Sequence, residues 1–129
     1  MSLPSEQEAI RAKCFHPSGQ FLEFPKEDLE RSIPERFEKI VRAHPDHLAI
    51  KTPVEELTYG ELNDIANRIA HSLIDRERSE ATPVALLFER GVQIIVAMLG
   101  VLKAGHFFVH LDPSLPKEKN AALLAKSQA

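Results

Sequence analysis

The segment from Val84 to Leu111 constrains the fold of this chain most strongly, because it places an apolar helix between two strands. Val84–Phe88 is an apolar run of strand length, and Phe107–Leu111 is another strand candidate. Between them, residues 91–103 carry apolar side chains on nearly every side, which is typical of a helix that protein covers all round. Strand, helix and strand in this order form a βαβ unit with parallel strands and a right-handed crossover. The sequence therefore predicts an α/β fold.

Two amphipathic helices are predicted before this unit, and each begins with a capping box. Ser32 with Glu35 marks one start, and Thr58 with Glu61 marks the other. Apolar residues follow at helical spacing. They are Ile33, Phe37, Ile40 and Val41 in the first helix, and Leu62, Ile65, Ala66, Ile69, Ala70 and Leu73 in the second. The first helix should end at His44-Pro45-Asp46, and the second at about Asp75.

Residues 1–31 are predicted to form an irregular arm, with a short turn or strand at Gln20–Phe24, because they show little periodicity. Residues 32–129 are predicted to be the folded piece, including a short strand at Leu48–Ile50 and a last helix that Pro116 opens. One βαβ unit and two amphipathic helices do not cover a buried helix and both faces of a sheet. We therefore expect a partial mixed or parallel sheet with packed helices, which further sequence or self-association with another copy would complete.

Composition argues against several classes of partner. The formal net charge is −3 and no basic stripe stands out, so we expect no nucleic acid. The longest apolar stretch, within residues 91–102, is too short to span a bilayer, so we expect no membrane. Cys14 is the only cysteine, which fits a reducing, cytoplasmic location.

A search for phosphate and metal sites finds only weak candidates. The five glycines form no phosphate-binding motif, and the turn Glu89-Arg90-Gly91 is better explained as a tight strand-to-helix connection. His106 and His110 are spaced so that they would share one face of a strand, but no third ligand is nearby. A second pair, His44 and His47, brackets Pro45-Asp46. Packed or solvated histidines are the favoured interpretation.

No nucleophile or acid–base pair emerges either. Cys14 has no obvious base, so a free thiol is favoured. Glu61 already caps a helix, and Asp64 stands in the same first turn, where the helix dipole favours it. The pairs Glu55-Glu56 and Glu77-Arg78 are typical of solvated surface. We therefore predict no catalytic, cofactor-binding or metal-binding residue within residues 1–129.

Two motifs identify a family. Leu57-Thr58-Tyr59-Gly60-Glu61-Leu62 resembles the first core motif of nonribosomal peptide synthetase adenylation domains. Leu102-Lys103-Ala104-Gly105, followed by residues 107–113, resembles the second. The stretch between the motifs and the lead-in from Ser32 also look like this family. The resemblance covers residues 32–129 with order and spacing preserved.

This resemblance implies the N-terminal fragment of the large subdomain of an adenylate-forming enzyme. Such a ligase uses ATP and Mg²⁺ to convert an amino acid into an aminoacyl-AMP, and then loads the acyl group onto the phosphopantetheine thiol of a carrier protein. In this family the phosphate loop, the substrate pocket, the ribose aspartate and the catalytic lysine all follow the second core motif. The resemblance thus implies that the 129-residue chain alone is inactive, binds no ATP and needs the remainder of the domain. Lys103 ends a helix, where a cation suits the dipole, so we assign it a structural role.

Four residues depart from the family's pattern. His110 stands where proline is usual, His106 where a small residue is common, Phe108 where tyrosine is frequent and Gly91 where serine is common. Two alternatives stay open beside the peptide-synthetase interpretation. One is a fragment of an acyl-CoA synthetase-type carboxylic acid ligase. The other is a stand-alone adenylation-like interaction or regulatory module.

Overall fold

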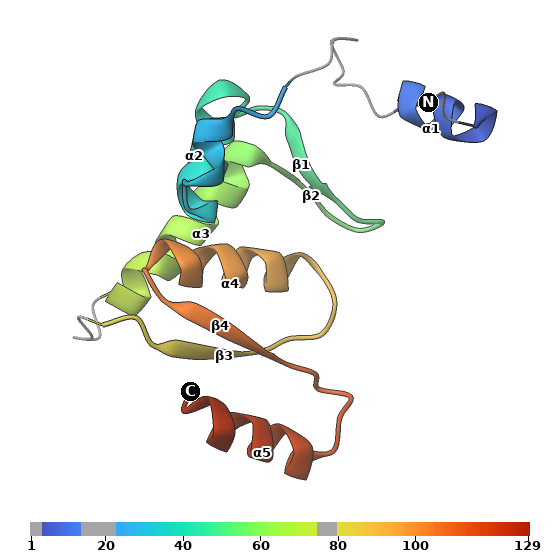
Figure 1. Ribbon diagram of the computed structural model, residues 1–129. Helices are drawn as coiled ribbons and strands as arrows, with labels where there is room; N and C mark the ends of the chain where they lie inside the picture. Colours follow the sequence, from blue (N-terminus) through green and yellow to red (C-terminus); the bar gives the residue numbers. More distant parts are fainter. Residues whose placement is uncertain (1–3, 14–22, 75–79) are drawn as a thin grey trace. The chain divides into compact units, whose positions relative to one another are not determined.

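The computed structural model describes residues 4–13, 23–74 and 80–129. The chain divides into two compact units, Met1–Arg31 and Ser32–Ala129 (Figure 1). In the described part of the chain, no helix is both long and apolar enough to cross a bilayer.

The first unit contains helix α1 (Ser5–Lys13) and the short 3-10 helix η1 (Lys26–Leu29). The irregular conformation expected for this segment is therefore wrong for residues 5–13. These residues are mostly good helix formers, and Glu6 and Glu8 suit the positive end of the helix dipole. The helix was missed because Ile10 is its one large apolar side chain and no apolar stripe marks it.

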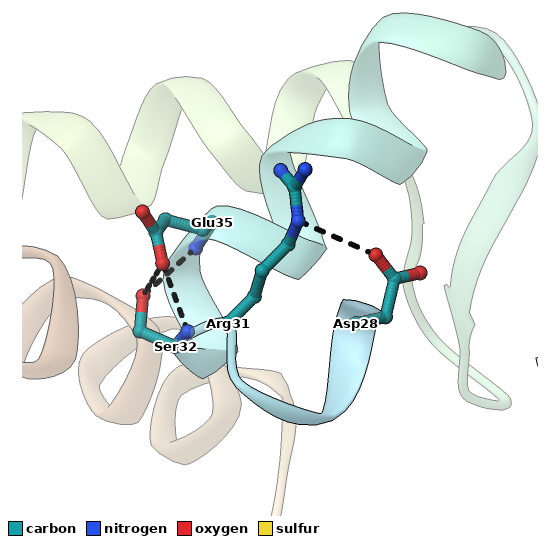
Figure 2. A network of polar contacts seen from close by, with 4 residues as sticks. All are labelled: Asp28, Arg31, Ser32 and Glu35. Carbon is teal, nitrogen blue, oxygen red and sulfur yellow. Dashed lines mark hydrogen bonds and ion pairs between the residues drawn. The ribbon is translucent and has the colours of Figure 1, made fainter. Parts of the chain in front are cut away.

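The end of this unit carries a buried carboxylate. Asp28 is buried in η1, and its Oδ1 lies 3.5 Å from Nε of Arg31 (Figure 2). Glu23 and Phe24 have no regular structure. The rest of the turn or strand expected at Gln20–Phe24 lies outside the described residues.

The second unit begins with a helix, a hairpin and a second helix, followed by the βαβ unit and a last helix. Its elements are α2 (Ile33–Ala43), β1 (Leu48–Lys51), β2 (Glu56–Thr58), α3 (Tyr59–Ile74), β3 (Pro83–Leu87), α4 (Val92–Lys103), β4 (Phe107–Leu111) and α5 (Lys117–Ser127). Each helix and strand predicted within residues 32–129 is present, with ends displaced by at most three residues, and β2 is an additional strand that was not predicted.

Both predicted capping boxes are confirmed. At α2, the backbone N–H of Glu35 donates to Ser32 Oγ at 3.3 Å, and the backbone N–H of Ser32 donates to Glu35 Oε2 at 2.9 Å (Figure 2). At α3, the backbone N–H of Glu61 donates to Thr58 Oγ1 at 3.2 Å, and the backbone N–H of Thr58 donates to Glu61 Oε2 at 2.9 Å. The carboxylate of Glu61 accepts hydrogen bonds from the backbone N–H of Thr58 and also, at 3.0 Å, from Oγ1 of Thr58, and these two bonds lower the pKa of Glu61. Both helix starts are therefore fixed by local side chains.

The strands form two separate pairs. β1 and β2 are antiparallel, with an irregularity between Leu48 and Ile50. β3 and β4 are parallel, in register from Pro83 opposite Phe107 to Leu87 opposite Leu111, and α4 connects them (Figure 1). The predicted βαβ unit and the α/β class are confirmed, and the partial sheet expected to be mixed or parallel is a parallel pair, separate from the antiparallel hairpin.

Helices α3 and α4 pack closely at the centre of this unit. One group of buried residues, Leu62, Val92 and Val96, holds Ile50 and Leu57 of the hairpin. A second group, Leu86, Ala97 and Val101, holds β3 and β4. The two helices therefore join the hairpin to the parallel strand pair.

The described residues do not cover α4 all round, as expected for one βαβ unit with two amphipathic helices. Ile95 of α4 is 42% exposed. On the strand pair, Leu87 and Phe107 are 58% and 49% exposed, while α5 contacts β4. An apolar pattern shows which side chains tolerate burial. On α4, the described neighbouring elements cover only some of the apolar side chains.

Gly100 sets the distance between α3 and α4. A Cβ atom at this position would lie 2.6 Å from Ile69 Cγ2 and 3.2 Å from the backbone oxygen of Ala66. We expect Gly100→Ala to lower the free energy of unfolding by about 1–2 kcal/mol, because overpacking outweighs the gain in helix propensity. Urea unfolding of the 129-residue chain measures this change.

The control is Gln93→Ala, an exposed change on the same helix. It should alter the free energy of unfolding by less than about 0.5 kcal/mol. A Gly100→Ala variant as stable as the parent would show that the helices are not held at this distance.

Candidate functional site

Lys103, in the second core motif, is a buried cation. Its Nζ lies 2.5 Å from Oε1 of Glu38 on α2 and 5.8 Å from the centroid of the Phe37 ring. The side chain of Lys103 is 4% exposed, whereas that of Glu38 is 44% exposed. Because Lys103 ends α4, this ion pair fastens the end of α4 to α2. The geometry gives Lys103 a structural role.

An open groove of about 700 Å³ lies over this ion pair. We call it the α2–α3–α4 groove, because its walls are the start of α2, the second half of α3 and the end of α4. Glu38, Lys103 and His106 contribute polar groups, and Ile33 and Ile74 contribute exposed apolar side chains. The groove is thus polar in part and apolar in part.

His106 is held inside the fold. The backbone N–H of Thr82 donates to its Nδ1 at 3.2 Å, and Thr82 Oγ1 lies 3.3 Å from the same atom. Since a backbone N–H can only donate, Nδ1 is the acceptor, and a neutral ring carries its proton on Nε2. His106 is 8% exposed, so it joins the start of β3 to the turn before β4 as a packed histidine.

The other described histidines do not form a metal site with it. His110 lies on β4 and is exposed, unlike His106, which precedes the strand. The rings of His44 and His47 stack at 4.7 Å between centroids, with 16° between their planes. Among the described residues, no three His, Cys, Asp or Glu side chains are grouped so that they could hold a metal ion.

A second cavity, of about 450 Å³, lies where β3 and β4 end. Glu89 and Arg90 follow β3, while His110 and Asp112 come from β4 and the turn after it. Asp112 Oδ1 accepts hydrogen bonds from the backbone N–H and Oγ of Ser114, at 2.8 and 2.7 Å. These bonds, with smaller contributions from His110 and Arg90, lower the pKa of Asp112.

This strand-end cavity gathers both signs of charge. Arg90, from the turn that the sequence marked as a weak anion candidate, shares it with the carboxylates of Glu89 and Asp112. Sequence reasoning missed Asp112 here, although the carboxyl ends of neighbouring parallel strands lie at one edge of a sheet. The mixed charge does not define an anion site.

The remaining candidates among the described residues do not join a site. Cys14 and the pair Glu77-Arg78 lie outside the described residues. Asp64 is exposed on α3. Glu56 pairs with Lys51 across the hairpin at 2.6 Å, as solvated surface charges do.

Residues 37–129 match the family model described as AMP-binding enzyme. The match covers most of the chain, and the chain belongs to this family. The chain is also 40% identical over 97 residues to one of the linear gramicidin synthase proteins of Brevibacillus parabrevis. That alignment covers 75% of this chain and 2% of the synthase. These matches confirm the resemblance drawn from the two core motifs.

Solved structures agree with this assignment. The N-terminal subdomain of NpsA from Klebsiella oxytoca has a TM-score of 0.71 at 24% identity, over 77% of this chain and 26% of that chain. NpsA in an artificially fused adenylation–PCP di-domain gives 0.72 at 24% identity, over 77% of this chain and 19% of the fusion. The nonribosomal peptide synthetase FmoA3 has a TM-score of 0.71 at 32% identity, over 74% of this chain and 10% of that chain. The fold therefore matches part of the N-terminal subdomain of adenylate-forming enzymes.

The chain is much shorter than its relatives. It spans between 1% and 8% of the length of the first curated relatives that it matches. What those proteins do as wholes bears on this chain only as a proposal.

The ion pair between Glu38 and Lys103 can be tested against the exposed pair between Glu56 and Lys51. We expect Glu38→Gln to lower the free energy of unfolding by about 2 kcal/mol, because it leaves a buried ammonium without its carboxylate. Glu56→Gln changes an ion pair whose side chains are more than half exposed, so the loss should stay below about 0.5 kcal/mol. Urea unfolding of the two variants measures both values. Equal losses would contradict the structural role of Lys103.

Proposed function

We propose that this chain is part of an ATP-dependent ligase that activates an amino acid for nonribosomal peptide synthesis. The observation that carries the proposal is the pair of core motifs, in order and correctly spaced, on the framework of an AMP-binding enzyme. The identity with linear gramicidin synthase supports the peptide-synthetase branch of this family. A cytoplasmic location belongs to the same proposal, because ATP is the co-substrate.

The proposed reaction has two steps. In the first, a carboxylate oxygen of the amino acid attacks the α-phosphorus of ATP, and pyrophosphate leaves; Mg²⁺, when bound, would balance the charge of the phosphates. In the second, the phosphopantetheine thiolate of a carrier protein attacks the acyl carbon, and AMP leaves. Both steps develop negative charge that fixed cations and hydrogen-bond donors must stabilise.

The residues of this chain serve the reaction as a framework. We assign none of residues 1–129 to catalysis, to cofactor binding or to a metal ion. Lys103 supports this assignment, because its Nζ forms an ion pair with Glu38 and its side chain is only 4% exposed. The same reasoning holds for His106, whose Nδ1 is committed to Thr82.

An exchange assay tests the activity. We expect a protein that contains this segment to exchange labelled pyrophosphate into ATP when an amino acid is supplied. Exchange that depends on fatty or aryl acids instead would favour the acyl-CoA synthetase alternative and contradict the proposal. The 129-residue chain alone should show no saturable ATP binding by calorimetry, and saturable binding would overturn the assignment of no cofactor residue.

Self-association of the isolated chain is a further part of the proposal. It is supported by the exposed apolar side chains Leu87 and Phe107 on a pair of strands. Such strands expose unpaired backbone groups and apolar surface that another copy can cover. Light scattering of the 129-residue chain should detect species larger than a monomer. A monomer that binds no apolar dye would contradict self-association, but it would not bear on the proposed reaction.

A further inference from the structure

His106 is a buried titratable side chain that connects the starts of the two parallel strands. It is 8% exposed and directly precedes β4, while Thr82 directly precedes β3. The backbone N–H of Thr82 donates to Nδ1 of His106 at 3.2 Å. The backbone oxygen of Thr82 accepts the backbone N–H of Phe107 at 3.3 Å. Two hydrogen bonds therefore fix Thr82 at this end of the strand pair, and one of them depends on the ring of His106.

The bond to Nδ1 requires the neutral form of the ring. In the imidazolium form both ring nitrogens carry a hydrogen, so Nδ1 could no longer accept. Its hydrogen would face the backbone N–H of Thr82, which can only donate. Burial adds to the cost, because a charged ring loses its hydration. An unperturbed histidine, as in an unfolded chain, takes up a proton below about pH 6.5. Folding and protonation of this ring therefore oppose each other.

The other ionisable groups that share a cavity with His106 come from α2, α3, α4 and the last residue. They are Glu35, Glu38, His71, Lys103 and the terminal carboxylate of Ala129. The two carboxylates of α2 already have partners, because Glu38 pairs with Lys103 and Glu35 accepts from Ser32. His71 and Ala129 are exposed, so solvent and salt screen their charges. The hydrogen bond at the ring itself distinguishes the two protonation states more directly than these neighbours do.

We propose that His106 is a pH-sensitive switch at the start of the βαβ unit. The neutral ring holds Thr82 beside β4. A ring that takes up a proton loses this hydrogen bond and releases the start of β3. Because the unfolded chain binds this proton and the folded chain does not, the stabilisation is complete above about pH 6.5 and decreases as the pH falls. A small residue is common at this position in the family's pattern, so the switch is a property of this chain.

Nuclear magnetic resonance of the unmodified 129-residue chain tests the switch at its origin. At pH 7.5, the ring nitrogen signals of His106 should show a neutral ring with its proton on Nε2. As the pH is lowered, uptake of a proton by this ring should coincide with shifts in the backbone amide signals of Thr82 and Phe107. Uptake of the proton while both amide signals stay in place would overturn the proposal.

His106→Asn tests the effect of the switch on stability. Its side-chain oxygen can accept the Thr82 N–H in place of Nδ1, but the amide does not titrate. Between pH 7.5 and pH 5.5, we expect the folding equilibrium constant of the parent to fall about tenfold relative to that of this variant. Urea unfolding at the two pH values measures the ratio, in which the contributions of other titrating groups cancel. His71→Asn is the matched control, and its ratio to the parent should not change with pH.

Thr82→Val separates the backbone bond from the hydroxyl group. Thr82 Oγ1 lies 3.3 Å from Nδ1 and can accept a hydrogen from a charged ring, whereas valine retains only the backbone N–H. We expect Thr82→Val to keep at least the full pH dependence of the parent. Loss of this dependence in Thr82→Val, or equal pH dependence in the parent and His106→Asn, would overturn the proposal. Neither result bears on pyrophosphate exchange, so the proposed reaction is tested separately.

Discussion

The close approach of α3 and α4 is the contact on which the rest of the Ser32–Ala129 unit depends. Ala66 is fully buried, and Gly100 leaves room for Ile69 where any side chain would collide. Buried residues on one part of this helix pair hold the β1–β2 hairpin, and those on another part hold β3 and β4. The two small sheets share no strand pairing, so the helix pair is what unites them.

The second core motif contributes to this arrangement through structure. Lys103 ends α4 and, through Glu38, fastens α2 to the helix pair. A buried ion pair of this kind adds little net stability, but it leaves a costly charge if one partner is lost. Retaining a buried lysine therefore requires a retained carboxylate.

Local patterns predicted much of the fold, since they depend on residues close in the chain. The Ser32 and Thr58 capping boxes and the βαβ order are of this kind. Helix α1 was missed because its helix formers carry no apolar stripe. The hydrogen bond from Thr82 to His106 joins residues 24 apart, and no local pattern predicts it.

The sequence predicted that α4 is incompletely covered, but which of its side chains stay exposed, and the strand-end cavity, could not be predicted, for a related reason. The sequence shows that α4 tolerates burial on every side, but its exposed Ile95 depends on which neighbours reach it. The meeting of Arg90 with Asp112 depends on the register of β3 and β4. Periodicity identifies the elements, and packing decides which side chains meet.

Hydrogen exchange of the backbone amides tests most directly whether α3 and α4 organise this unit. The slowest exchange reports the last structure to open. If the helix pair unites the two sheets, the slowest amides will lie in α3 and α4 around Ala66 and Gly100, with those of the β1–β2 hairpin and α5 faster. Slowest exchange in the hairpin or α5, with fast exchange around Ala66 and Gly100, would contradict this account.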